Sequence, residues 1–157
     1  AEMCHLLGLK IMIFSKTFDQ VKEQFPEYVS CDLSKILKES DIVSFHCKPN
    51  PDGSSIINAK EISIMKNNVL IINTARGNLV SEIDLFDAIK KNNIGGVALD
   101  VFSEEPANNN ILFGLENVLL TPHIAASTVE AQIIVAEMIA NQFVDYFLDN
   151  KINNSVI

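Results

Sequence analysis

The protein has 157 residues, of which 48% are hydrophobic and 20% charged, and this balance excludes a disordered or collagen-like chain. No apolar run reaches the ~20 residues that a membrane-spanning helix needs, so we expect no membrane partner. Its 12 basic and 20 acidic residues give a net charge of −8. This charge repels the phosphates of nucleic acids, so we expect no nucleic-acid partner either.

Short apolar runs recur along the chain and predict β-strands. They are too short for helices, and their apolar residues follow one another without alternating with polar ones. This pattern is typical of parallel strands that are covered on both faces. The predicted strands cover residues 10–14, 41–47, 69–72, 96–99 and 117–120.

Longer segments carry helix signals. Ser81 with Asp84 predicts a capping box that opens a helix ending at a pair of lysines. Ser127 is predicted to cap the last helix, whose apolar residues recur at three- and four-residue spacing. Two of them, Phe143 and Phe147, we assign to the core. Strands that alternate with helices predict one α/β domain with a doubly wound parallel sheet, which is a Rossmann-like fold.

The three cysteines, Cys4, Cys31 and Cys47, are odd in number and widely spaced, and they form no CxxC pair. Such cysteines are typical of a reducing compartment, so we expect a cytoplasmic protein. We assign no residue to a metal site.

Polar side chains follow the predicted strands, at the edge where a parallel sheet binds its ligands. His123 offers an imidazole whose unperturbed pKa lies near neutrality, as an acid/base needs. Glu105 can orient that ring and stabilise its protonated form, and Arg76 offers a planar fork of donors for a carboxylate. This set suits removal of a proton from a 2-hydroxy acid while hydride leaves the same carbon. No side chain can accept the hydride, so a nicotinamide is implied.

Several stretches resemble the D-isomer-specific 2-hydroxyacid dehydrogenases, in the order and spacing of that family. They are residues 41–46, 73–77, 96–106 and 121–128. Residues 126–132 and 142–145 are most similar to the phosphoglycerate dehydrogenase branch. The resemblance implies an NAD-dependent oxidoreductase that acts on a small 2-hydroxy or 2-keto acid and forms a homodimer.

The resemblance also implies a role for each matching position. Arg76 matches the substrate-binding arginine, Glu105 the glutamate that supports the catalytic histidine, and His123 the proton donor and acceptor. Asp100 matches the carboxylate that contacts the nicotinamide carboxamide, with a cap of the following turn as the alternative. Cys47 falls where the family has a small residue near the adenosine, with a small buried residue as the alternative. The implied cofactor-binding residues are Ser15, Cys47, Thr74, Ala75, Arg76, Asp100, His123, Ala125 and Ala126.

One departure from the family is an absence. A dinucleotide-binding fold opens with a strand and G-x-G-x-x-G, whereas residues 1–8 look like the helix that follows that loop. We therefore expect residues 1–157 to form a partial nucleotide-binding domain whose last residues lead back toward an absent substrate domain. By itself, this chain is expected to bind cofactor weakly and to turn over no substrate.

A second departure concerns the cofactor. An acidic residue usually accepts hydrogen bonds from the adenosine ribose of NAD, and here Ser15 takes that place, with Lys16 beside it. This pair favours a 2′-phosphate, although Asp19 can reach back if the loop is short. We expect NAD first, with NADP as the alternative.

Three functions stay open at this point. The first is oxidation of D-3-phosphoglycerate in serine biosynthesis, and the second is reduction of glyoxylate or hydroxypyruvate, which Ser15 and Lys16 favour. The third is a cofactor-sensing module like the co-repressors related to this family, which keep the same Arg, Glu and His. Turnover by the intact protein separates the enzymes from the sensor.

Overall fold

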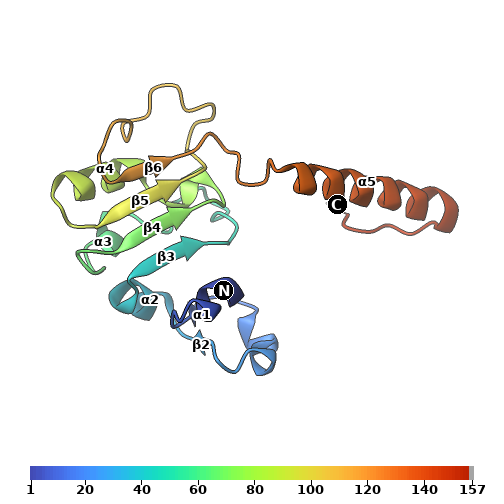
Figure 1. Ribbon diagram of the computed structural model, residues 1–157, viewed down its shortest axis with the longest axis horizontal. Coiled ribbons are helices and arrows are strands. Elements are labelled where there is room, and N and C mark those ends of the chain that lie inside the picture. Colours follow the sequence, from blue (N-terminus) through green and yellow to red (C-terminus); the bar gives the residue numbers. More distant parts are fainter. Residues whose placement is uncertain (156–157) are drawn as a thin grey trace. The chain divides into compact units, whose positions relative to one another are not determined.

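In the computed structural model, which describes residues 1–155, four parallel strands form the main sheet. They are β3 (Ile42–Phe45), β4 (Leu70–Asn73), β5 (Gly96–Leu99) and β6 (Val118–Leu120), in this order. Their arrowheads point to one edge of the sheet (Figure 1). The predicted α/β class with parallel strands is confirmed, and the carboxyl ends of these strands lie at a common edge.

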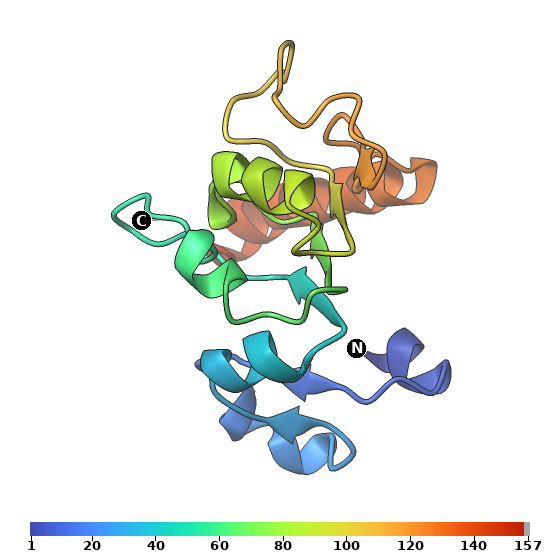
Figure 2. The same cartoon turned by 90° about the vertical axis from the view of Figure 1, so that its left-hand side faces the viewer.

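A second, two-stranded parallel sheet is formed by β1 (Met12–Ile13) and β2 (Val29–Ser30). The 3₁₀ helices η1 (Phe18–Gln20) and η2 (Lys22–Gln24) lie between these strands in the chain. Figures 1 and 2 both place this small sheet beside α2 (Leu33–Glu39). β1 lies within the strand predicted for residues 10–14. β2 was missed, because two residues make no apolar run that can be detected in the sequence.

Helices and one face of the main sheet enclose the core. These helices are α2, α3 (Ala59–Ile62) and α4 (Glu82–Lys90). The remaining helices of residues 1–122 are α1 (Glu2–Leu6) and the short 3₁₀ helix η3 (Gly77–Leu79). Each of α2, α3 and α4 contributes to one apolar cluster with the strands, which includes Leu37, Ile62, Leu85, Val43, Ile71 and Val97.

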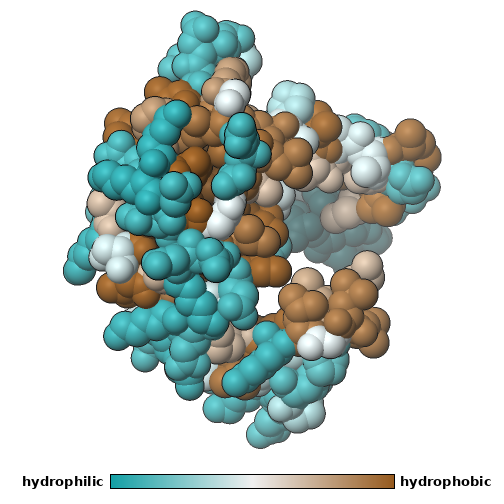
Figure 3. Space-filling model, turned by 60° about the vertical axis from the view of Figure 1, so that its left-hand side comes forward, coloured by the Kyte–Doolittle hydropathy of each residue, from teal (hydrophilic) through white to brown (hydrophobic). Residues whose placement is uncertain are grey.

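The alternate residues of the strands face away from this core and are exposed. Ile42 is 42% exposed, Leu70 43% and Leu119 66%. The continuous apolar runs had predicted strands that are covered on both faces. Within residues 1–122, only one face of the sheet is covered. Figure 3 shows apolar surface next to hydrophilic surface on one side of the molecule.

The described chain forms two compact units, residues 1–122 and a second unit that begins at His123 and contains α5 (Val129–Asp149). Every side chain of α5 is at least partly exposed. Phe143 is 58% and Phe147 73% exposed, so their assignment to the core was wrong. None of the helices in residues 1–155 combines the length and apolarity that crossing a membrane requires.

Side-chain caps begin the two predicted helices. The Ser81 hydroxyl accepts a hydrogen bond from the Asp84 N–H (3.4 Å), which is one of the two hydrogen bonds of the predicted capping box. For α5 the cap is Thr128, whose hydroxyl accepts from the Ala131 N–H (3.1 Å). The prediction of Ser127 was one residue early, because the Ser127 N–H donates to the Ile124 carbonyl (2.9 Å) in the preceding turn.

Candidate functional site

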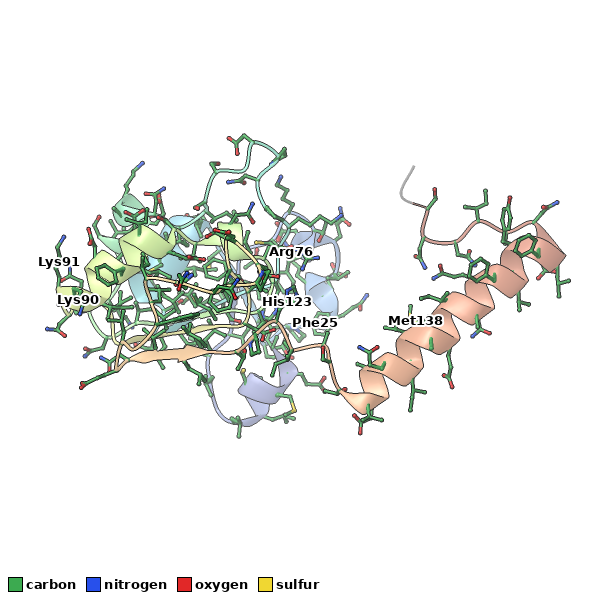
Figure 4. The ribbon with its side chains drawn as sticks, turned by 90° about the horizontal axis from the view of Figure 1, so that it is seen from above. Phe25, Arg76, Lys90, Lys91, His123 and Met138 are labelled. Carbon is green, nitrogen blue, oxygen red and sulfur yellow. The ribbon has the colours of Figure 1, made fainter. Side chains whose placement is uncertain are left out.

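The segments after β3 and β4 line a cleft of about 330 Å³ at the carboxyl edge of the main sheet. Figure 4 shows Arg76 at this end of the unit and Lys90 and Lys91 at the opposite end. Several predicted site residues thus meet at one place. The residues lining the cleft are His46, Cys47, Lys48, Pro49, Thr74, Ala75 and Arg76.

Cys47 and Lys48 are exposed on the wall of this cleft. The alternative interpretation of Cys47 as a small buried residue is therefore wrong. His46, to which sequence reasoning gave no role, lies beside them and shares a hydrogen bond with the Ser44 hydroxyl (2.9 Å from Nε2). A thiol, an ammonium and an imidazole consequently line one wall.

Asn73 braces the loop that contributes Thr74, Ala75 and Arg76 to the cleft. It is 1% exposed, its Nδ2 donates to the Arg76 carbonyl (2.7 Å), and its Oδ1 accepts from the Ala75 N–H (3.1 Å). The Arg76 Nη1 donates in turn to the Ala75 carbonyl (2.6 Å). These contacts cross-link the loop from Asn73 to Arg76. Sequence reasoning gave Asn73 no role, although this residue ends an apolar strand and begins the motif 73–77.

Gly77 lets this loop pack against the chain that follows β5. A Cβ atom at Gly77 would lie 1.8 Å from the Phe102 carbonyl oxygen and 2.5 Å from the Ser103 nitrogen. Real Cβ atoms do not approach backbone atoms so closely, so only glycine fits between Arg76 and this segment. The segments that carry Arg76 and Glu105 are therefore in direct backbone contact.

Asp100 and Glu105 follow β5. Asp100 is 3% exposed, and its carboxylate accepts a hydrogen bond from the Thr121 hydroxyl at the end of β6 (2.5 Å). The Glu105 carboxylate accepts from the Phe102 N–H (3.0 Å). Thr121 was also given no role by sequence reasoning. Its signals were its position directly after the neighbouring strand and its place at the start of the motif 121–128.

Hydroxyl and ammonium groups follow β1. The Ser15 hydroxyl accepts from the Thr17 N–H (3.3 Å), and both residues are exposed, as is Lys16. The Asp19 carboxylate, further along the chain, contacts the Lys22 ammonium (3.4 Å). The turn thus presents donors without a carboxylate of its own, which suits an anion.

His123, Ala125 and Ala126 lie at the start of the second unit, and all three are exposed. His123 has left-handed backbone, with φ at 54°, a conformation in which histidine, asparagine and aspartate are enriched among non-glycine residues. The association of these residues with Arg76 and Glu105 stays a prediction.

Comparison with known families gives a match over most of the chain. The sequence profile described as D-isomer specific 2-hydroxyacid dehydrogenase, NAD binding domain, matches residues 1–125. This range contains every predicted site residue up to Ala125.

Curated proteins of similar sequence are longer than this chain. A glyoxylate reductase of Thermococcus litoralis is 40% identical over 141 residues, which is 88% of this chain and 42% of that protein. A D-3-phosphoglycerate dehydrogenase of a Synechocystis strain is 36% identical over 148 residues, 94% of this chain and 27% of that protein. The chain therefore spans less than half the length of these two relatives.

Two solved structures of similar fold contain nicotinamide cofactors. One is an acyclic imino acid reductase in complex with NADPH and D-Arg, with a TM-score of 0.88 and 31% identity. The alignment covers 99% of this chain and 48% of the reductase chain. The NAD-complexed form of a D-isomer specific 2-hydroxyacid dehydrogenase from Lactobacillus delbrueckii matches 99% and 51%, with a TM-score of 0.83 and 26% identity.

Proposed function

The chain belongs to the NAD binding domain of the D-isomer specific 2-hydroxyacid dehydrogenases, and from this we propose what the full-length protein does. It transfers a hydride between a D-2-hydroxy acid and a nicotinamide cofactor. The observation that carries the proposal is the cleft at the carboxyl edge of the sheet, where Thr74, Ala75 and Cys47 leave room for a cofactor beside Arg76.

The residues divide the chemistry among them. The Arg76 guanidinium binds the substrate carboxylate through two parallel hydrogen bonds. During oxidation the His123 imidazole takes the hydroxyl proton, and in the reverse direction it returns that proton. The Glu105 carboxylate orients the imidazole and stabilises its protonated form. Asp100 accepts a hydrogen bond from the cofactor carboxamide. When bound, the cofactor supplies the hydride acceptor.

We propose D-3-phosphoglycerate as the substrate, oxidised in serine biosynthesis by a cytoplasmic homodimer. The match to a D-3-phosphoglycerate dehydrogenase over 94% of the chain supports this choice. Reduction of glyoxylate or hydroxypyruvate is the second candidate, because a glyoxylate reductase is 40% identical and because Ser15 and Lys16 leave the turn after β1 without a carboxylate.

The test of the function is turnover by the full-length protein. Absorbance of the reduced nicotinamide is followed with phosphohydroxypyruvate, hydroxypyruvate and glyoxylate, each with NADH and with NADPH. The highest kcat/KM with phosphohydroxypyruvate supports the first candidate, and a preference for either of the other acids supports the second. A folded protein that binds cofactor without turnover contradicts both and leaves the sensing module.

Cofactor choice gives a prediction at the turn after β1. Ser15→Asp is expected to lower kcat/KM with NADPH at least about tenfold, because a carboxylate within hydrogen-bond reach of the ribose repels the 2′-phosphate. Activity with NADH is expected to stay or rise. The matched control is Ser34→Asp, which adds the same charge at an exposed position in the first turn of α2, where an acid is tolerated. Equal losses with both cofactors would contradict a contact between residue 15 and the ribose.

Cofactor occupancy is expected to shield Cys47. In the full-length protein, saturating NADH should slow alkylation of the Cys47 thiol at least about tenfold, because this thiol lines the cleft and only an accessible thiolate reacts. Cys4 and Cys31 are the internal references. Burial raises the pKa of the Cys31 thiol, so Cys31 should react slowly with or without cofactor. Mass spectrometry of the modified peptides measures all three rates, and unchanged alkylation of Cys47 would place the cofactor elsewhere.

A further inference from the structure

We propose that Glu82 is a positioning residue, whose carboxylate fastens the loop after β5 and thereby holds Glu105 in place. The proposal rests on the function proposed above, because it assigns Glu105 the support of the acid/base His123. Glu82 itself lies in the first turn of α4, remote in sequence from the residues that it holds.

Both carboxylate oxygens of Glu82 bind this loop. Oε1 accepts a hydrogen bond from the Ser103 N–H (2.7 Å), and Oε2 accepts one from the Asn110 Nδ2 (2.7 Å). The Asn110 Oδ1 accepts in turn from the N–H of Leu112, whose side chain is 0% exposed. One carboxylate thus ties both ends of the segment 103–110 to the start of a helix.

The hydrogen bond from Ser103 to Glu82 lies next to the Phe102 N–H, which donates to Glu105. The Glu105 Oε1 accepts from the Phe102 N–H (3.0 Å), and Phe102 is the neighbour of Ser103. The Phe102 side chain is 7% exposed and packs edge-on against Phe113. Gly77 packs against the Phe102 carbonyl from the other side. The peptide that holds Glu105 is therefore clamped between Gly77 and Glu82, and its orientation depends on both.

The helix dipole offers a simpler explanation for an acidic residue at position 82, and a second acidic residue in α4 allows a test of it. Acidic residues in the first turn of a helix are favourable whatever they contact, because of the helix dipole. Asp84 shares that turn. The variant Asp84→Asn therefore removes an equal charge from the same turn without touching the contacts to Ser103 and Asn110. It is the matched control for Glu82→Gln.

The experiment uses the full-length protein and the 2-oxo acid that it reduces best. For Glu82→Gln we expect kcat to fall on the order of tenfold. We also expect the upper pKa of the kcat/KM profile, which reports the protonated imidazole, to fall. A loosely held Glu105 stabilises the imidazolium less, so the active form is lost at lower pH. Asn110→Asp keeps the acceptor for Leu112 and repels Glu82, so it should lower the same pKa. Asp84→Asn should change neither kcat nor the profile.

Several outcomes would overturn the proposal. A loss of kcat without movement of the profile, or an equal pKa shift in Asp84→Asn, reduces Glu82 to a structural or general electrostatic role. If the wild-type protein turns over no 2-oxo acid, the proposed function fails first. Hydrogen exchange at the Phe102 and Ser103 amides then tests separately whether Glu82 holds this segment. Faster exchange in Glu82→Gln than in Asp84→Asn supports the positioning role of Glu82, and equal exchange refutes it.

Discussion

Replacing His123 with asparagine is expected to lower kcat of the full-length protein by roughly 10²- to 10⁴-fold, which is the usual contribution of a positioned acid/base. Asparagine is the informative replacement because the backbone at this residue has φ at 54°. Asparagine enters this left-handed region readily, whereas alanine would add a cost of about 1–2 kcal/mol. The substitution therefore removes the imidazole and leaves the backbone preference. Steady-state rates with NADH measure the effect.

The other histidines make this test selective. The chain has three, and His5 in the exposed helix α1 serves as the control, since His5→Asn should leave kcat unchanged. His46 lines the cleft and is the competing candidate. Full activity in His123→Asn together with a comparable loss in His46→Asn would transfer the acid/base role to His46 and contradict the role proposed for His123.

Gly77→Ala is expected to destabilise the protein by about 3 kcal/mol or more. The new Cβ would lie 1.8 Å from the Phe102 carbonyl oxygen, and because both partners belong to backbone segments, no side-chain rotation relieves the overlap. The segment 102–103 must move away, so turnover should fall together with the free energy of unfolding. Urea unfolding of the full-length protein followed by circular dichroism, with activity measured in parallel, gives both quantities.

Gly114→Ala is the control for this substitution. Gly114 has φ at 77° but no heavy atom within 4 Å of a built Cβ, so its replacement should cost only about 1–2 kcal/mol of backbone strain. It should leave kcat unchanged. Equal losses of stability in the two variants would show that glycine at residue 77 serves backbone freedom and not close packing.

Local sequence was sufficient for much of the architecture. The runs around Val43, Ile71 and Val97 predicted the parallel strands because a strand within a sheet carries its signal in a few consecutive residues. Cys47 and Arg76, which follow two different strands, were predicted to lie at one edge of the sheet, since the carboxyl ends of parallel strands share that edge.

Other features depend on groups far apart in the chain. The strand Val29–Ser30 exists through pairing with Met12–Ile13, and its own residues carry too little signal to predict it. Phe143 and Phe147, which were predicted to lie in the core, are exposed. The prediction failed because periodic apolar residues identify the apolar face of a helix without identifying what covers that face.

The sequence by itself therefore determined the α/β class, the family and the residue types at the carboxyl edge, all of which reside in short segments. Only the tertiary structure decided how these segments are held. It brought the Asn73 amide to the Arg76 carbonyl, set Gly77 against Phe102, and joined Glu82 to Ser103. Glu82 and Ser103 are 21 positions apart, so no periodic pattern in the sequence predicts the hydrogen bond between them. The two residues come together only when the strands align in the sheet.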